Sequence, residues 1–201
     1  VAYIVENNIG GDIIECGVQS GIKIRIILEF LVRHNIQNRR VFLYDTFEGM
    51  TEPCEYDVQS VGNVNLKDRW VKHNYVSLED VQRNVGNTGY PKELVFFIKG
   101  DVLETLPNKT HEKIALLRLD TDLYHSSRQE LECLYDLVVP GGVVIFDDYG
   151  AIQTRNGYSA FVSAGIATAP IDILCSYNKI DGTKQLIVAC GGSVWRNSGN
   201  T

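Results

Sequence analysis

The chain has 201 residues, of which 44% are hydrophobic, and its formal net charge is −6 at pH 7. This length is enough for one hydrophobic core, so we expect a single domain over residues 1–201. The negative charge argues against nucleic acid and anionic membranes as partners, because both favour a basic surface, and no apolar run approaches the roughly 18 residues of a membrane span.

The cysteines are odd in number, widely spaced and mostly set in apolar runs: Cys16, Cys54, Cys133, Cys175 and Cys190. This pattern indicates reduced, buried thiols and neither a disulfide framework nor a zinc site. With no targeting segment at the amino terminus, it predicts a cytoplasmic protein. The chain begins with Val1 and passes almost at once into a strand-like segment, so we expect residues ahead of Val1 to be missing.

Apolar runs of strand length alternate with amphipathic segments of helix length. We expect strands at residues 12–17, 40–45, 94–99, 113–120 and 142–147, and helices at 21–34, from Ser77 onward, between the last two of these strands, and at 157–168. Ser77 is expected to cap its helix with Asp80 three positions later, and Ser126 or Ser127 to cap the helix that follows the fourth strand.

Two further strand-like runs at residues 171–175 and 185–190 are joined by a hairpin signal at 178–182. Five βα units followed by a carboxyl-terminal hairpin predict a mostly parallel sheet with one antiparallel strand at its far end. Such sheets bind ligands at the carboxyl ends of their strands, near the point where the strand order reverses.

The segment 46–76 lacks this periodicity, contains Pro53 and Gly62, and carries aromatic side chains that include Trp70 and Tyr75. Long loops inside compact domains are usually functional or disordered, and the aromatic content favours a lid. We therefore predict a lid loop over residues 46–76.

The turn after the first strand, residues 15–21 (ECGVQSG), offers the first candidate site. Gly17 allows a ligand to approach the backbone closely, and the start of the next helix, near Ser20, presents free N–H groups to a carboxylate. Glu15 would hold an ammonium group, directly or through water. A ligand with both groups, such as the methionine part of S-adenosylmethionine, suits this turn.

Asp45 ends the second strand, where a carboxylate commonly accepts hydrogen bonds from a ribose diol. Asp101 follows the third strand, where an adenine edge would lie. The alternative is structural: Glu15 and Asp101 cap helices, and Gly17 only makes a tight turn. A nicotinamide dehydrogenase is disfavoured, because Gln19 stands in place of the middle glycine of the G-x-G-x-x-G pattern.

Carboxylates gather at the ends of the fourth and fifth strands: Asp120 and Asp122 on one, Asp147 and Asp148 on the other. Neighbouring parallel strands lie about 4.8 Å apart, so Asp120, Asp147 and Asp148 can converge and hold a hard divalent cation such as Mg²⁺. Asp122 is the better candidate for a general base, because it stays free of the metal. The alternative is that Asp147 and Asp148 begin a loop and Asp122 caps the next helix.

The histidines carry less information. His34 and His111 are expected to be solvated, whereas His73 and His125 flank the proposed site. Trp70, Tyr75, Tyr124 and Tyr149 either line a substrate pocket or simply pack, since both are common for such side chains.

Several runs together resemble the macrocin O-methyltransferase family, whose members tailor sugars of macrolide and aminocoumarin antibiotics. They are residues 15–18 (ECGV), 45–49 (DTFEG), 105–107 (TLP), 117–124 (LRLDTDLY), 140–142 (PGG) and 147–149 (DDY). The resemblance covers about residues 12–195. It implies a class I methyltransferase: a doubly wound, Rossmann-like, mostly parallel seven-stranded α/β sheet with a carboxyl-terminal antiparallel hairpin.

The resemblance further implies dependence on S-adenosylmethionine and Mg²⁺, and methylation of a hydroxyl group on a sugar or other small natural product. It assigns cofactor contacts to Glu15, Gly17, Ser20, Asp45 and Asp101, metal ligation to Asp120, Asp147 and Asp148, and proton removal to Asp122.

Family members also carry helices ahead of the first strand that help to build a dimer, so a homo-oligomer agrees with the resemblance. This chain has almost none of that part, and it departs from the family pattern at His125 and Gln19, near the acceptor pocket. A non-catalytic or truncated cofactor-binding module is therefore kept as the alternative function.

Overall fold

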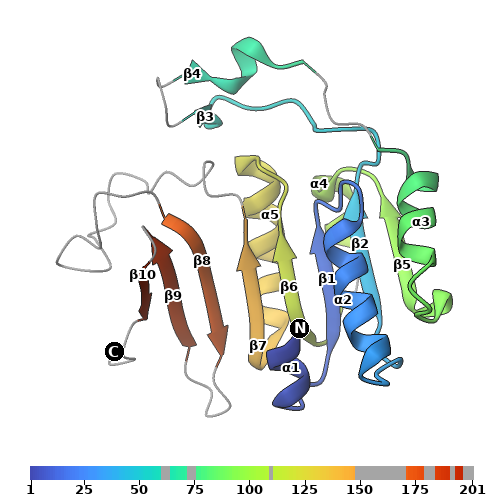
Figure 1. Cartoon of the computed structure of the whole chain (residues 1–201). Helices are drawn as coiled ribbons and strands as arrows, with labels where there is room; N and C mark the ends of the chain where they lie inside the picture. Colours follow the sequence, from blue (N-terminus) through green and yellow to red (C-terminus); the bar gives the residue numbers. More distant parts are fainter. Residues whose placement is uncertain are drawn as a thin grey trace.

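The structure is a computed structural model that describes residues 1–59, 64–71, 76–108 and 111–147, together with the strands at 171–178, 184–190 and 193–196. Its main body is a sheet with helices on both faces (Figure 1). The helices are α1 (Ala2–Glu6), α2 (Ile22–Arg33), α3 (Leu78–Gly86), α4 (Val102–Thr105) and α5 (Tyr124–Leu134). The strands of the parallel part are β1 (Asp12–Cys16), β2 (Val41–Asp45), β5 (Val95–Lys99), β6 (Ile114–Leu119) and β7 (Val138–Phe146).

The strands pair in the order β10-β9-β8-β7-β6-β1-β2-β5. The pairs β1/β2, β1/β6, β2/β5 and β6/β7 are parallel. The strands β8 (Ile171–Asn178), β9 (Lys184–Cys190) and β10 (Ser193–Arg196) pair antiparallel. The predicted mostly parallel α/β sheet is thus confirmed, whereas the count of seven strands is not, since this order has eight. The carboxyl-terminal hairpin stays a prediction, because its turn lies outside the described residues.

Two apolar clusters fill the two faces of the sheet, and strand alternation explains the division. In β1, Ile13 belongs to the cluster that includes Ile24 and Leu28 of α2. The next residue, Ile14, belongs to the cluster that includes Val102 of α4 and Leu134 of α5. Neighbouring side chains of a strand point to opposite faces, so a fully buried strand such as β1 has apolar residues at consecutive positions.

The strand order reverses at β1, which has β2 on one side and β6 on the other. The carboxyl ends of these strands form the upper edge of the sheet in Figure 1. The described parts of the predicted lid cross above that edge and include β3 (Val58–Gln59), β4 (Val64–Asn65) and the short helix η1 (Leu66–Arg69). The fold therefore assembles the loops that follow β1, β2, β5 and β6 under this segment.

The predicted capping of the α3 helix is confirmed, since the Ser77 hydroxyl accepts a hydrogen bond from the Asp80 backbone N–H at 3.2 Å. The predicted capping of α5 is wrong. This helix begins at Tyr124, and Ser126 and Ser127 lie buried inside it. Its first amide, that of Tyr124, donates at 2.7 Å to Asp57 of the lid segment. A side chain distant in sequence has taken the role that a local serine was expected to play.

The structure differs from the predicted pattern at two further points, the helix α1 and the burial of His111. The helix α1 precedes the first strand, and Ile4 in it is completely buried in the core. His111 is buried rather than solvated, because its ring packs on Phe42 and its Nε2 lies 2.6 Å from the Tyr44 hydroxyl. The helix predicted at 157–168 lies outside the described residues.

The described cysteines Cys16, Cys54 and Cys133 are free thiols, of which Cys16 is fully buried. Among the described residues, no helix combines the length and the apolar character that a bilayer-spanning helix needs.

Candidate functional site

The turn between β1 and α2 is built around Gly17. Its φ is +81°, and a Cβ at this position would lie 1.9 Å from the carbonyl oxygen of Asp120. The Asp120 N–H donates to the carbonyl of Cys16 at 2.9 Å, so the end of β6 and the turn are held in direct backbone contact. Only glycine allows both this φ and this approach. The tight turn that the structural alternative expected at Gly17 is therefore present, and the cofactor contact of Gly17 stays a prediction.

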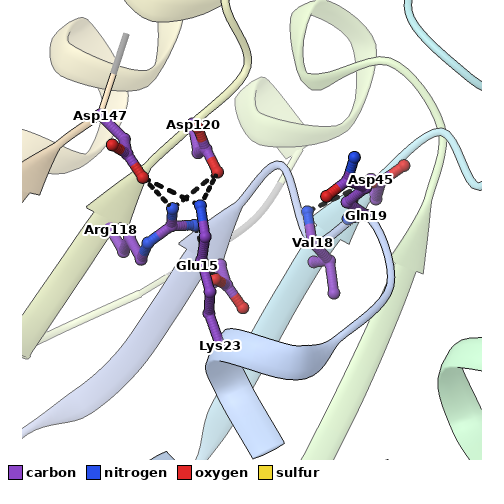
Figure 2. A network of polar contacts seen from close by, with 8 residues as sticks. All are labelled: Glu15, Val18, Gln19, Lys23, Asp45, Arg118, Asp120 and Asp147. Atoms are coloured by element: carbon purple, nitrogen blue, oxygen red, sulfur yellow. Dashed lines mark hydrogen bonds and ion pairs between the residues drawn. The ribbon is translucent and has the colours of Figure 1, made fainter. Parts of the chain in front are cut away.

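Asp45, at the end of β2, organises the same turn. Its Oδ2 accepts hydrogen bonds from the Val18 and Gln19 backbone N–H groups at 2.8 and 2.9 Å (Figure 2). Its Oδ1 accepts one from the Phe47 N–H at 2.7 Å. The carboxylate thus fixes the amides that begin the turn, a role the sequence did not indicate. Asp45 also faces the cavity described below, and its predicted contact with a ribose stays a prediction.

Arg118 of β6 connects the acidic residues at the ends of three strands. Its side chain is 7% exposed and donates to Glu15 Oε1 at 2.8 Å and to Asp120 Oδ2 at 2.6 Å. The same guanidinium contacts Asp147 Oδ2. Asp120 and Asp147 therefore meet at one point, as the sequence predicted (Figure 2).

A second cation approaches that point from α2. The ammonium of Lys23 lies 2.7 Å from Asp120 Oδ2 and 2.9 Å from Asp147 Oδ2. Its side chain is 53% exposed, in contrast to the buried Arg118. The two carboxylate oxygens are thus shared between a buried guanidinium and an accessible ammonium.

Burial and charge shift the ionisation of this cluster in opposite directions. Burial raises the pKa of Glu15 to about 7, although the neighbouring Arg118 opposes the shift. The hydrogen bond from Lys23 lowers the pKa of Asp147, and Arg118 adds to this effect. Burial by itself lowers the pKa of Lys23, but the hydrogen bonds to Asp120 and Asp147 outweigh it, so the pKa is raised. The outer carboxylate is therefore held ionised, while Glu15 is the one that takes up a proton first.

A cavity of about 270 Å³ lies along the carboxyl ends of β1, β2, β5 and β6. Its wall includes candidate site residues from the sequence analysis and one residue of the charged cluster above: Gly17, Asp45, Asp101, Asp120, Asp122 and Lys23. The lid segment contributes Met50, Thr51 and Val76. The structure thus brings the predicted cofactor turn and the predicted base to one cavity.

Glu15 and Ser20 are absent from the described wall of this cavity. Glu15 is 1% exposed, and its Oε1 accepts from Arg118 at 2.8 Å. Ser20 meets α3 through its carbonyl, which accepts from Asn84 at 3.0 Å. The cofactor roles of both stay predictions.

Asp101 and Asp122 reach the wall in different ways. Asp101 caps α4 by accepting from the Leu103 N–H at 2.9 Å, which confirms the structural alternative for this residue. Asp101 also lines the cavity. Asp122 adopts a φ of +63° between β6 and α5. Left-handed backbone is uncommon outside glycine, although aspartate tolerates it, and such residues cluster at functional sites. The N-cap residue of α5 is Leu123, and both interpretations of Asp122, as a base and as a cap, stay predictions.

Two of the three predicted metal ligands, Asp120 and Asp147, lie in the part of the chain that the structure describes. Within the described ranges, no group of three or more His, Cys, Asp or Glu side chains is placed to hold a metal ion. Asp148, the third predicted ligand, lies outside those ranges. The two carboxylates that are described fit a hard divalent cation in donor type and in convergence, because one ammonium already touches both.

The lid segment is attached to the site by Asp57. This side chain is 2% exposed and accepts from the Cys54 N–H and the Tyr124 N–H, both at 2.7 Å. The ring of Tyr56 lies 5.0 Å from that of Tyr124, and the ring of His125 lies 5.4 Å from the same tyrosine. The lid therefore contacts the start of α5, two residues after Asp122.

Sequence reasoning missed Lys23, Arg118 and Asp57 as parts of this site. Arg118 had a detectable signal, since it is a lone charge inside the apolar run 114–119. Lys23 and Asp57 had none, because a lysine on an amphipathic helix and an aspartate in a polar loop are ordinary surface residues.

The sequence model of the macrocin O-methyltransferase family matches residues 1–179 of this chain. The 8-demethyl-8-(2,3-dimethoxy-alpha-L-rhamnosyl)-tetracenomycin-C 4'-O-methyltransferase of Streptomyces olivaceus is 32% identical over 201 residues, which cover 98% of this chain and 70% of that protein. Demethyldecarbamoylnovobiocin O-methyltransferase of Streptomyces niveus is 35% identical over 149 residues, which cover 74% of this chain and 56% of that protein.

Among solved structures, the O-methyltransferase NovP superposes with a TM-score of 0.62 at 35% identity, over 74% of this chain and 61% of NovP. The calicheamicin methyltransferase CalS11 superposes with a TM-score of 0.61 at 23% identity, over 75% of this chain and 61% of CalS11, which is a likeness of fold. The chain thus spans less than two thirds of the length of NovP, CalS11 and the novobiocin relative.

Proposed function

Because the chain belongs to the macrocin O-methyltransferase family, we propose that it methylates a hydroxyl group of a sugar or other small natural-product acceptor, with S-adenosylmethionine as the methyl donor. The observation that carries the proposal is the cavity that joins the β1–α2 turn to Asp122. The relative from Streptomyces olivaceus, named for a rhamnosyl substrate, supports a sugar as the acceptor.

The methyl donor binds along the turn, and S-adenosylmethionine supplies an electrophilic methyl group on its sulfonium. The free amides at the start of α2 suit its carboxylate. Asp45 and Asp101 present carboxylates to the same cavity, where a ribose and an adenine offer hydrogen-bond donors. Asp45 also holds the amides of Val18 and Gln19 in place, so the turn is organised before the ligand arrives.

Asp122 removes the proton from the acceptor hydroxyl. It stands on the cavity wall, in the segment that leads from β6 into α5. Asp120 and Asp147, with Asp148, hold Mg²⁺, which would lower the pKa of the hydroxyl and orient it. The convergence of Asp120 and Asp147 supports this assignment.

Residues 46–76 close over the acceptor as a lid. Met50, Thr51 and Val76 already contribute to the cavity wall, and Asp57 ties the segment to the start of α5. The aromatic rings of Tyr56 and Tyr124 lie 5.0 Å apart where the lid segment meets α5, and such rings suit the apolar face of a sugar ring.

The cofactor half of the proposal is tested by titration calorimetry with S-adenosylhomocysteine, for which we expect a dissociation constant in the low micromolar range. No heat of binding at millimolar ligand would refute it. Binding without methylation of any glycosylated acceptor would instead favour the cofactor-binding module.

The catalytic half is tested with Asp122→Asn. We expect kcat to fall by about 100-fold or more, the usual contribution of a general base, while the affinity for S-adenosylhomocysteine is kept. The matched control is Asp136→Asn, since Asp136 is an exposed aspartate of the short helix η4 (Tyr135–Leu137) that does not contribute to the described cavity wall. Equal activity of the two variants would show that the base has been misassigned.

A further inference from the structure

Lys23 occupies an unusual position for a lysine, because it lies in the first turn of α2. The start of a helix carries a partial positive charge, which favours an anion there and disfavours a cation. The first turn of α2 contains no acidic residue, and no side chain caps it. Two positive features, the helix start and an ammonium, therefore meet at the turn that follows β1, and α2 supplies no carboxylate there to balance them.

Two aspartates from neighbouring strands orient the ammonium of Lys23. The side chain crosses from α2 to the carboxyl ends of β6 and β7, where it donates to Asp120 Oδ2 at 2.7 Å and to Asp147 Oδ2 at 2.9 Å (Figure 2). These described contacts use two of the three N–H donors of the ammonium. The side chain is still 53% exposed and forms part of the cavity wall. A third donor can therefore meet an oxygen of a ligand in the cavity.

The two aspartates do not depend on Lys23 alone. The guanidinium of Arg118 contacts the same two oxygens, and Glu15 fixes it from behind. Arg118 is 7% exposed, whereas Lys23 has a flexible four-carbon stem. Lys23 can therefore turn toward a ligand without leaving a carboxylate buried and unpaired.

The charges of the cavity wall make Lys23 the place for a ligand carboxylate. It is the only lysine, arginine or histidine in the described wall, which otherwise carries the carboxylates of Asp45, Asp101, Asp120 and Asp122. An anionic group is repelled by those side chains and attracted by the ammonium. S-adenosylmethionine has one carboxylate, on its methionine part, and the proposed function places that carboxylate at the start of α2.

We propose that Lys23 binds the carboxylate of the methyl donor and so makes the site select donors that carry this group. The inference rests on the methyl donor of the proposed function and is independent of the metal. It predicts a coupling between one group of the protein and one group of the ligand: the ammonium should matter only when the carboxylate is present.

The test uses titration calorimetry with S-adenosylhomocysteine and with S-adenosyl-3-thiopropylamine, an analogue that lacks only the carboxylate. We expect Lys23→Met to weaken the binding of S-adenosylhomocysteine about tenfold, as for loss of one hydrogen bond to a charged group. The affinity for the analogue should stay the same or rise slightly, because its ammonium gains nothing from Lys23. Lys23→Arg keeps the positive charge and should recover part of the lost affinity.

The matched control is Lys113→Met, since Lys113 is an exposed lysine just ahead of β6, at the opposite end of that strand. It should leave the affinity for both ligands unchanged. Lys23→Gln repeats the measurement if the methionine variant does not fold.

Equal affinity of the wild type and Lys23→Met for S-adenosylhomocysteine would overturn the role of Lys23 and leave the methyl donor intact. An equal loss for both ligands would also overturn it, because Lys23 would then only hold the strand ends in place. If the wild type binds neither ligand, the methyl donor of the proposed function fails, and the role of Lys23 fails with it.

Discussion

The substitution Gly17→Ala tests how strictly the β1–α2 turn is determined. The φ of +81° places an alanine in the left-handed region, which costs roughly 1–2 kcal/mol. The added Cβ would also lie 1.9 Å from the Asp120 oxygen and 2.5 Å from its carbonyl carbon, far inside the usual contact distance of about 3.5 Å. Both partners are backbone, so the turn and the end of β6 have to separate, with a strain comparable to overpacking, about 1–3 kcal/mol.

Together these effects lower the free energy of unfolding by roughly 2–5 kcal/mol. For a domain of this size each kcal/mol corresponds to roughly 2–4 °C, so we expect a decrease of about 4–20 °C in Tm. Thermal unfolding followed by circular dichroism measures it. Calorimetry should show weaker binding of S-adenosylhomocysteine as well, because the displaced turn carries the amides that Asp45 now holds.

The control is Gly86→Ala, the same chemical change in α3. Gly86 has no positive φ, and the nearest atom to an added Cβ is Lys92 Cε at 3.9 Å. Alanine there should leave stability unchanged or raise it by up to about 1 kcal/mol, since glycine is a poor helix former. If Gly17→Ala unfolds within a degree of the wild type, the contact between the turn and β6 does not constrain the fold as argued.

Three further changes follow from the charged and polar contacts of the site. Arg118→Met should lower the free energy of urea unfolding by about 1–3 kcal/mol, because the buried Glu15 loses its hydrogen-bond donor and takes up a proton, and an unchanged midpoint would contradict that dependence. Burial raises the pKa of Glu15 to about 7, so the folded state holds this proton more tightly than the unfolded chain: the stabilisation is complete below pH 4.5 and is lost as the pH rises through 7. Glu15→Gln should flatten this dependence, worth about 3 kcal/mol, in urea titrations across that range; a slope that persists would assign it to another group. Asp57→Ala should destabilise the chain by about 1–3 kcal/mol and speed hydrogen exchange at the Tyr124 amide, whereas Asp57→Asn keeps an acceptor oxygen and should lose less.

The sequence by itself determined the architecture, because apolar runs of strand length alternate with amphipathic segments of helix length along the chain. The apolar runs within residues 12–17 and 113–120 predicted two strands of a parallel sheet, and β1 and β6 formed there. The Ser77 and Asp80 spacing predicted the start of α3 correctly. The carboxyl ends of parallel strands share one edge, so Asp45, Asp101, Asp120 and Asp122 were expected along the same edge of the sheet, and all four contribute to the cavity.

Tertiary structure alone decided the partner of each side chain. The sequence gives no sign that Glu15 turns away from the cavity to Arg118, that Lys23 crosses to Asp120, or that Asp57 replaces a serine at the start of α5. These contacts join residues between 67 and 103 positions apart along the chain. Their pairing depends on strand order, on the path of a long loop and on which charge is buried, and none of these is encoded in the few residues around each partner.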